Sequence, residues 1–299
     1  MAKSRLSVVL GALIALGGCG GTGSVLDSGT DGALACCDAW IAEGGVPADG
    51  NLTDGSMSPC RHWPTDRPIR VLFVGNSQID FWDMAQLVSS LSESAPEDCA
   101  RITGERFTIG GANLRTLWSD ADRAGRRLPE VLATGGYDAV VITESIDLVE
   151  LRPPYPEQFS EDAQVIADAA RAAGALPILY ATPYVERPDH TGFHDMADPQ
   201  LALGEQLAIP VAAGGLAWLR VWEQEPGADL YFTDRAHPGF HGSYISGLVI
   251  WSTLTGGTPV GLTASPETTC EDVGCTPISP DQADLYQSAA WAQQLETGR

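Results

Sequence analysis

A serine in the sequence VLFVGNSQIDFW, residues 71–82, is placed where it could do chemistry. Ser77 follows Gly75 and Asn76, after a short apolar run and before a segment with a helical pattern. One interpretation is structural, because glycine and asparagine tolerate left-handed turns and serine caps helices. The other is catalytic, because a tight turn after a strand lifts a serine hydroxyl to the carboxyl edge of a sheet, where open α/β folds bind substrates. These twelve residues alone favour the turn.

A nucleophilic serine needs a base, and a histidine base needs an acceptor that holds its tautomer. His62 lies early in the chain, and His190 and His194 lie in a polar segment. The segment YFTDRAHPGFHGSYISG differs, because Asp234 precedes His237 by three residues. An Asp-x-x-His turn can bring a carboxylate to an imidazole by itself. The alternative is that the aspartate only caps a turn and the histidine is a surface residue.

The elements that would position these residues are short apolar runs alternating with helical patterns. We predict strands at 69–74, 106–110, 137–143 and 176–182. We predict helices over 84–91, 156–174, 214–224, 240–255 and 280–295. The alternation predicts parallel strands, and apolar runs flanked by helices predict burial on both faces. The expected fold class is therefore α/β, a three-layer α/β/α sandwich with a parallel sheet.

The first residues predict export. Lys3 and Arg5 precede an apolar run at 6–16 that is too short to span a bilayer but has the length of a signal-peptide core. The run leads to Gly17-Gly18-Cys19, which resembles the lipobox of bacterial lipoproteins, although ordinary signal cleavage would leave similar residues. We expect a signal peptide at 1–18 and a lipid anchor at Cys19 that holds the protein in a bacterial cell envelope, periplasmic or at the cell surface.

Beyond the anchor we expect a tether and cysteine-containing lead-in at 19–67 and one domain at 68–299. The net charge is −22, and removing residues 1–18 takes away Lys3 and Arg5 and no acid, which makes it about −24. Such a surface repels phosphate backbones and anionic lipid headgroups, so nucleic acid is not an expected partner.

The cysteines predict disulfides, because an even number follows Cys19 in an exported chain. They are Cys36, Cys37, Cys60, Cys99, Cys270 and Cys275. Cys270 and Cys275 could close a small loop. The adjacent Cys36 and Cys37 would then form disulfides with Cys60 and Cys99, in either combination. No Cys-x-x-Cys pair occurs and the histidines are not grouped with the cysteines, so we expect no metal site.

Two of these segments together resemble the SGNH/GDSL hydrolase superfamily, in its Gly-Asn-Ser variant, over residues 69 to about 256. VLFVGNSQ resembles the first block and DRAHPGFHGSYISG the last, which implies Ser77 as nucleophile, Asp234 as orienting acid and His237 as base. FTIGGANLRTLW, at 107–118, resembles the second block, whose glycine N–H joins the serine amide in an oxyanion hole. Gly111 is the best match there, and Gly110 is the alternative. The implied fold is SGNH hydrolase-like and flavodoxin-like.

The third block departs from the family pattern. Its asparagine should follow the third strand, where VVITESID has Glu144 and Ser145 instead. Losing that donor would cost about 3 kcal/mol of transition-state stabilisation unless Asn113 or Ser145 replaced it. As a carboxylate, Glu144 would repel an oxyanion.

The sequence therefore predicts a serine esterase that needs no metal or organic cofactor. The expected substrates are small-molecule or polysaccharide esters, with acetyl groups on carbohydrate favoured by the charge and the predicted export. Trp82, Trp118 and Tyr184 could stack on sugar rings, or pack between helix and sheet as such residues usually do. The alternatives are a non-catalytic glycan-binding or scaffold lipoprotein on the same fold, and an O-acyltransferase.

Overall fold

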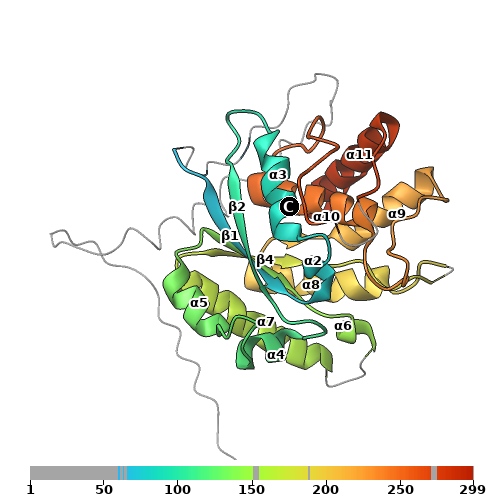
Figure 1. The fold of residues 1–299 in the computed structure, drawn as a ribbon. Coiled ribbons are helices and arrows are strands. Elements are labelled where there is room, and N and C mark those ends of the chain that lie inside the picture. The colour runs from blue at the N-terminus through green and yellow to red at the C-terminus, as the bar shows by residue number, and fades with distance from the viewer. Residues whose placement is uncertain are drawn as a thin grey trace, which may run out of the picture.

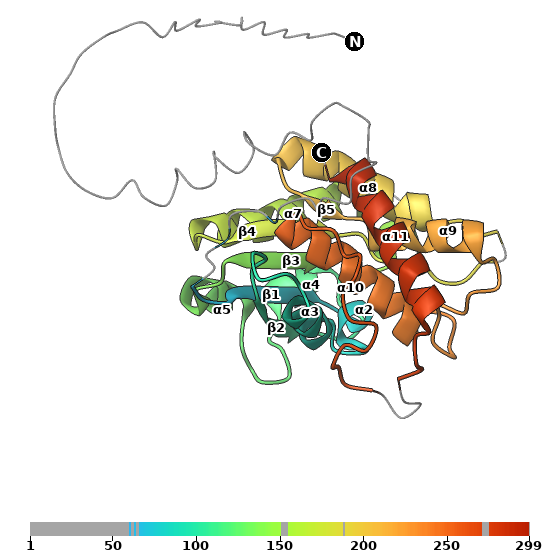
Figure 2. The same ribbon diagram turned by 90° about the horizontal axis from the view of Figure 1, so that it is seen from above.

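The computed structural model describes residues 60, 63, 66–150, 155–187, 189–270 and 275–298. These residues form a five-stranded sheet covered by helices on both faces (Figures 1 and 2). The strands are β1 (Ile69–Gly75), β2 (Ile102–Thr108), β3 (Ala139–Thr143), β4 (Leu176–Tyr180) and β5 (Val211–Ala212). They lie in the order β2-β1-β3-β4-β5, and every pairing is parallel. The predicted three-layer α/β/α class is confirmed.

Helices follow the strands and cover both faces of the sheet. They are α2 (Ser77–Asp80), α3 (Met84–Glu93), α4 (Leu114–Ser119), α5 (Leu128–Gly135), α6 (Asp147–Glu150), α7 (Tyr155–Ala172), α8 (Phe193–Leu207), α9 (Gly214–Gln224), α10 (Phe240–Thr255) and α11 (Pro280–Thr297). Helices α4, α5 and α7 lie on one face of the sheet and α3 and α10 on the other, with α11 packed outside α9 and α10 (Figure 1). None of the helices in the described part of the chain is long and apolar enough to cross a membrane.

Burial explains which segments form the centre of the sheet. All five residues of β3 are buried, and only Arg70 of β1 is exposed, because these strands have helices on both sides. Helix α10 is buried on nearly its whole circumference, and its glycines allow close packing. A Cβ on Gly247 would lie 2.3 Å from Cδ2 of Leu87 on α3, so Leu87 occupies the space that this glycine leaves free. The turns after β1 and β3, at the carboxyl edge of the sheet, therefore follow strands that are buried on both faces.

The predicted elements differ from the structure at the edges of the sheet. The second strand spans 102–108, not 106–110, and the short β5 was not predicted. Strand β2 is an edge strand whose residues between Ile102 and Phe107 are polar or glycine and are not fully buried, so its beginning lacks an apolar run. Hydroxyl groups of α3 protect it, because the N–H groups of Ile102 and Gly104 donate to Ser92 and Ser89. The residues after Thr108 leave the strand and form a turn.

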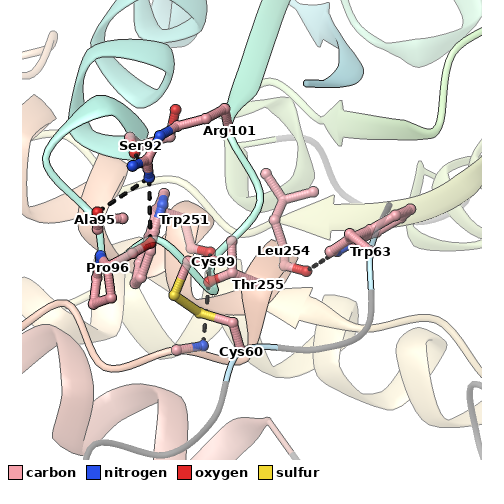
Figure 3. The surroundings of a disulfide bond; sticks show 11 residues. Cys60, Trp63, Ser92, Ala95, Pro96, Cys99, Arg101, Trp251, Leu254 and Thr255 are labelled. Atoms are coloured by element: carbon pink, nitrogen blue, oxygen red, sulfur yellow. Dashed lines mark hydrogen bonds between the residues drawn. A yellow bond between two sulfur atoms is a disulfide. The ribbon is translucent and has the colours of Figure 1, made fainter. Parts of the chain in front are cut away.

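The disulfides correct one cysteine prediction and confirm another. Cys60 bonds Cys99, with their Cα atoms 5.2 Å apart, so these two do not share Cys36 and Cys37 (Figure 3). The pairing is possible because residue 60 lies beside the loop that leads into β2. Cys270 bonds Cys275, as predicted. Cys36, Cys37, the signal peptide, the anchor at Cys19 and the lead-in up to residue 59 lie outside the described residues.

Beside the Cys60–Cys99 bond, the indole N–H of Trp63 donates to the carbonyl of Leu254, 2.7 Å away at the end of α10 (Figure 3). The disulfide and this hydrogen bond both lie near the amino ends of β1 and β2. The chain therefore enters the domain at the edge of the sheet opposite the carboxyl ends of the strands.

Candidate active site

Ser77 lies where β1 ends, as the first residue of α2. The preceding Gly75 is required by space, since a Cβ there would lie 2.7 Å from the Cβ of Thr143 on β3. Asn76 is the N-cap of α2, and its Oδ1 accepts a 3.0 Å hydrogen bond from the Gln78 amide. A helix cap is present at this turn, but it is Asn76 in an extended conformation and not the serine, which leaves the Ser77 hydroxyl for another partner.

That partner is His237, whose Nε2 lies 2.8 Å from the Ser77 Oγ. The other ring nitrogen, Nδ1, lies 2.6 Å from Oδ2 of Asp234. A carboxylate beside Nδ1 fixes the tautomer in which Nδ1–H donates to Asp234, and Nε2 then accepts the serine proton. The three residues predicted from the sequence are therefore brought together, in the order of a nucleophile, base and orienting acid.

The acid and the base share one tight turn. Asp234 Oδ1 accepts the backbone N–H groups of Ala236 and His237, both at 3.0 Å. Arg235 between them has a left-handed φ of 59°, and its own amide donates to the Phe232 carbonyl at 3.0 Å. One carboxylate therefore both builds the turn and orients the imidazole.

The electrostatics of this turn keep the acid ionised. Burial alone would raise the pKa of Asp234, but the two backbone N–H groups and the imidazole outweigh it and lower the pKa below its usual value. An ionised carboxylate at neutral pH stabilises the imidazolium that forms when His237 takes a proton.

A stacked aromatic ring holds the base from its other side. The ring of Phe81, just after α2, lies parallel to the imidazole of His237, with centroids 4.3 Å apart and an interplanar angle of 4°. Phe232 packs edge-on against Phe81 at 5.2 Å. The buried Trp82 donates its indole N–H to the carbonyl of Pro238, the residue after the base, at 2.8 Å. The segment that begins with the nucleophile thus also packs against the turn that carries the base.

The turn after β2 is the candidate oxyanion turn, residues 109–112. The Ile109 amide donates to the Gly75 carbonyl at 3.1 Å, which places this turn beside the nucleophile, and the Ala112 amide closes the turn on Ile109 at 3.1 Å. Gly111 has a left-handed φ of 70°, whereas Gly110 does not. Within the described residues the Gly111 amide has no hydrogen-bond acceptor. The Ser77 amide, at a helix N-terminus, also lacks an intrahelical acceptor.

The two residues considered as a third oxyanion donor, Asn113 and Ser145, both use their side-chain oxygens in local hydrogen bonds. The Oδ1 of Asn113 caps α4 by accepting from the Thr116 amide at 3.0 Å. Ser145, just after β3, is buried, and its Oγ accepts from the Asp147 amide at 3.2 Å. Glu144 is 1% exposed, and its Oε1 accepts the Ser145 amide at 2.6 Å. The carboxyl group thus lies inside the edge of the sheet, where the family pattern has an amide.

Comparison with known proteins shows the fold. A protein from Slackia heliotrinireducens, provisionally described as an SGNH hydrolase, superposes with a TM-score of 0.50 at 22% identity, over 62% of this chain and 98% of that one. The chain has the SGNH hydrolase fold. A DUF4886 family protein from Bacteroides uniformis superposes with a TM-score of 0.53 at 15% identity, over 78% of this chain and 96% of that one. No protein-family model and no curated protein sequence matches the chain.

Two aromatic residues considered for sugar stacking are committed to packing within the SGNH hydrolase fold. Trp82 is 2% exposed and Tyr184 is fully buried, so neither offers a ring face to a ligand. The phenol of Tyr184 contacts Glu150, and burial raises its pKa to about 12. Trp118 is only partly buried. Among the described residues no three His, Cys, Asp or Glu side chains gather into a metal-binding group.

The sequence reasoning missed three residues around the triad. Asn76, Gln78 and Phe81 all contact another loop of the site through their side chains. Asn76 was considered only as a turn residue and as the middle residue of the Gly-Asn-Ser variant. The one local signal for the others was their closeness to the serine, four residues or fewer along the chain.

Proposed function

We propose that this protein is a serine ester hydrolase of the SGNH type. The observation that carries the proposal is the unbroken series of hydrogen bonds from Ser77 to His237 to Asp234, at 2.8 and 2.6 Å. The first distance is within the range that proton transfer to a general base requires, and the second is that of a hydrogen bond that orients the base. A protein that only binds glycans has no need of this arrangement.

The proposed reaction has two halves. Ser77 Oγ attacks the ester carbonyl while Nε2 of His237 takes the hydroxyl proton, and the tetrahedral oxyanion accepts the amides of Ser77 and Gly111. The imidazolium gives its proton to the leaving alcohol, which produces an acyl-enzyme. Water then attacks this acyl group with His237 as base, and the acid leaves as Ser77 regains its proton. Asp234 stays ionised throughout and stabilises the charged imidazole.

The proposed substrates are short acyl esters, most simply acetyl groups carried on carbohydrate. The side chains of His237 and Asp234 are 24% and 40% exposed, so the site is open at the molecular surface. An open site suits a small acyl group on a large alcohol. The net charge of −22 disfavours anionic phospholipids. We also propose that the chain is an exported lipoprotein anchored through Cys19, with a neutral polysaccharide or a small ester as its partner.

The test is hydrolysis of 4-nitrophenyl acetate by the purified protein, prepared in an oxidising compartment so that both disulfides form. Ser77→Ala should lose nearly all turnover, because no other group attacks the ester. Ser288→Ala removes an exposed hydroxyl on α11 and is the matched control, expected to keep full activity. A serine-reactive phosphonate should label the wild-type protein at Ser77 only. Equal turnover in wild type and Ser77→Ala would refute the assignment.

A further inference from the structure

Two buried amide side chains flank the proposed nucleophile. Asn76 is 2% exposed and Gln78 is 6% exposed, on either side of Ser77. A buried amide is costly unless its polar atoms find partners, so the contacts of these two side chains are informative. Each donates a hydrogen bond to a backbone carbonyl, and the two carbonyls belong to the two other loops of the site.

Asn76 connects the nucleophile to the oxyanion turn. Its Nδ2 donates to the carbonyl of Ala112 at 3.0 Å, while its Oδ1 accepts the Gln78 amide at 3.0 Å. These opposite partners fix which atom is nitrogen and which is oxygen. An aspartate here would keep the helix cap but would place a second oxygen against the Ala112 carbonyl. The asparagine therefore matches this particular turn, which presents a carbonyl and requires a donor.

Gln78 connects the nucleophile to the acid–base turn. Its Nε2 donates at 3.2 Å to the carbonyl of Ala236, the residue between Arg235 and His237. Within the described residues its Oε1 is buried and has no hydrogen-bond partner. The bond from Nε2 to Ala236 is therefore the contact that joins this buried amide to the acid–base turn.

We propose that Asn76 and Gln78 are positioning residues for the reaction at Ser77. Asn76 holds the oxyanion turn and Gln78 holds the acid–base turn, each through one amide N–H. The two neighbours of the nucleophile thereby fix its distance to both partners of the reaction. This inference rests on the proposed function for its kinetic consequences, but not for its structural ones.

The test uses substitutions that change a donor into an acceptor without changing shape. Asn76→Asp and Gln78→Glu are compared with Gln86→Glu, which adds the same charge at an exposed position on α3. Hydrogen–deuterium exchange should rise in residues 107–114 for Asn76→Asp and in residues 232–238 for Gln78→Glu. It should rise in neither segment for Gln86→Glu. This crossed pattern does not depend on turnover.

The kinetic arm uses 4-nitrophenyl acetate. Each of the two variants should lose about 10- to 100-fold in kcat with little change in KM. The reason is that the backbone carbonyl of Ala112 or Ala236 loses the amide N–H that donates to it in the wild type. The activity of Asn76→Asp relative to wild type should recover as the pH falls, because a protonated carboxyl group can again donate to Ala112. A merely structural role would lower Tm without this pH dependence.

The outcomes separate the two proposals. Unchanged exchange in both segments, or the same rise in both segments for both variants, would overturn the positioning roles. Wild-type hydrolysis with both variants equally active would also overturn them and leave the esterase proposal standing. The crossed exchange pattern in a protein that hydrolyses no ester would support the positioning roles and refute the proposed function.

Discussion

Replacing Gly111 by alanine is the sharpest test of the oxyanion turn. Its φ is +70°, and a Cβ built there meets no atom within 4 Å, so alanine would not clash. The cost is the left-handed backbone, about 1–2 kcal/mol for a residue with a Cβ. That cost lowers Tm by about 2–8 °C in a domain of this size and leaves it folded. A turn that relaxes this strain must rotate the peptide plane that presents the Gly111 amide.

The activity of Gly111→Ala should therefore fall far more than its stability. Loss of one oxyanion donor costs about 10²- to 10³-fold in kcat. Gly110→Ala is the matched control, because Gly110 has no positive φ and its Cβ would also meet nothing within 4 Å. We expect its kcat to stay within a few-fold of wild type and its Tm to hold. The assay is 4-nitrophenyl acetate hydrolysis alongside thermal unfolding. Loss in Gly110→Ala with retention in Gly111→Ala would refute the assignment of the donor.

Two further predictions concern stability. Cys60→Ser with Cys99→Ser opens a loop whose ends are 39 residues apart and should cost about 4 kcal/mol, seen as a lower Tm. Its kcat should not change, because the bond lies at the opposite edge of the sheet, and a large loss of kcat would contradict that separation. Burial would raise the pKa of Asp138, but hydrogen bonds from Arg67 and the Arg70 amide lower it. Asp138 therefore stabilises the fold at a pH above its unfolded pKa of about 3.9, and this stabilisation is lost as the pH falls through its folded pKa. Asp138→Asn should lower Tm at pH 7, the difference from wild type should shrink as the pH falls through the folded pKa of Asp138, and a pH-independent difference in melting curves would argue against this linkage.

The triad could be predicted because its parts are local in sequence. Asp234 and His237 are three residues apart and form one turn, so their contact needs no knowledge of the fold. Ser77 could be placed at the sheet edge because an apolar run ended there. Only the meeting of the two segments depended on topology, and parallel strands bring all carboxyl ends to one edge.

The predictions that failed concern contacts between distant segments. The pairing of Cys60 with Cys99 depends on where the lead-in crosses the amino edge of the sheet, which spacing does not encode. Trp82 was considered for a ligand, but its ring is buried and its indole N–H donates to the carbonyl of Pro238, which is 156 residues away along the chain. Strand β2 begins earlier than expected because serine hydroxyls on α3 accept hydrogen bonds from N–H groups on its outer edge. These contacts join two separate elements, so no local sequence pattern shows them.

We expect Asn113, rather than Ser145, to supply the third oxyanion donor that the end of β3 lacks. A group that stabilises an oxyanion must reach the substrate, and Ser145 is only 6% exposed whereas Asn113 is partly exposed. The cap on α4 uses the Oδ1 of Asn113, which leaves its Nδ2 without an acceptor within the described residues. Asn113 also lies two residues after Gly111. The hydrogen bond from Asn76 to the Ala112 carbonyl therefore holds the segment that carries both groups, the Gly111 amide and the Asn113 side chain. A single buried amide would then position both proposed donors after β2, the Gly111 amide and the Asn113 side chain.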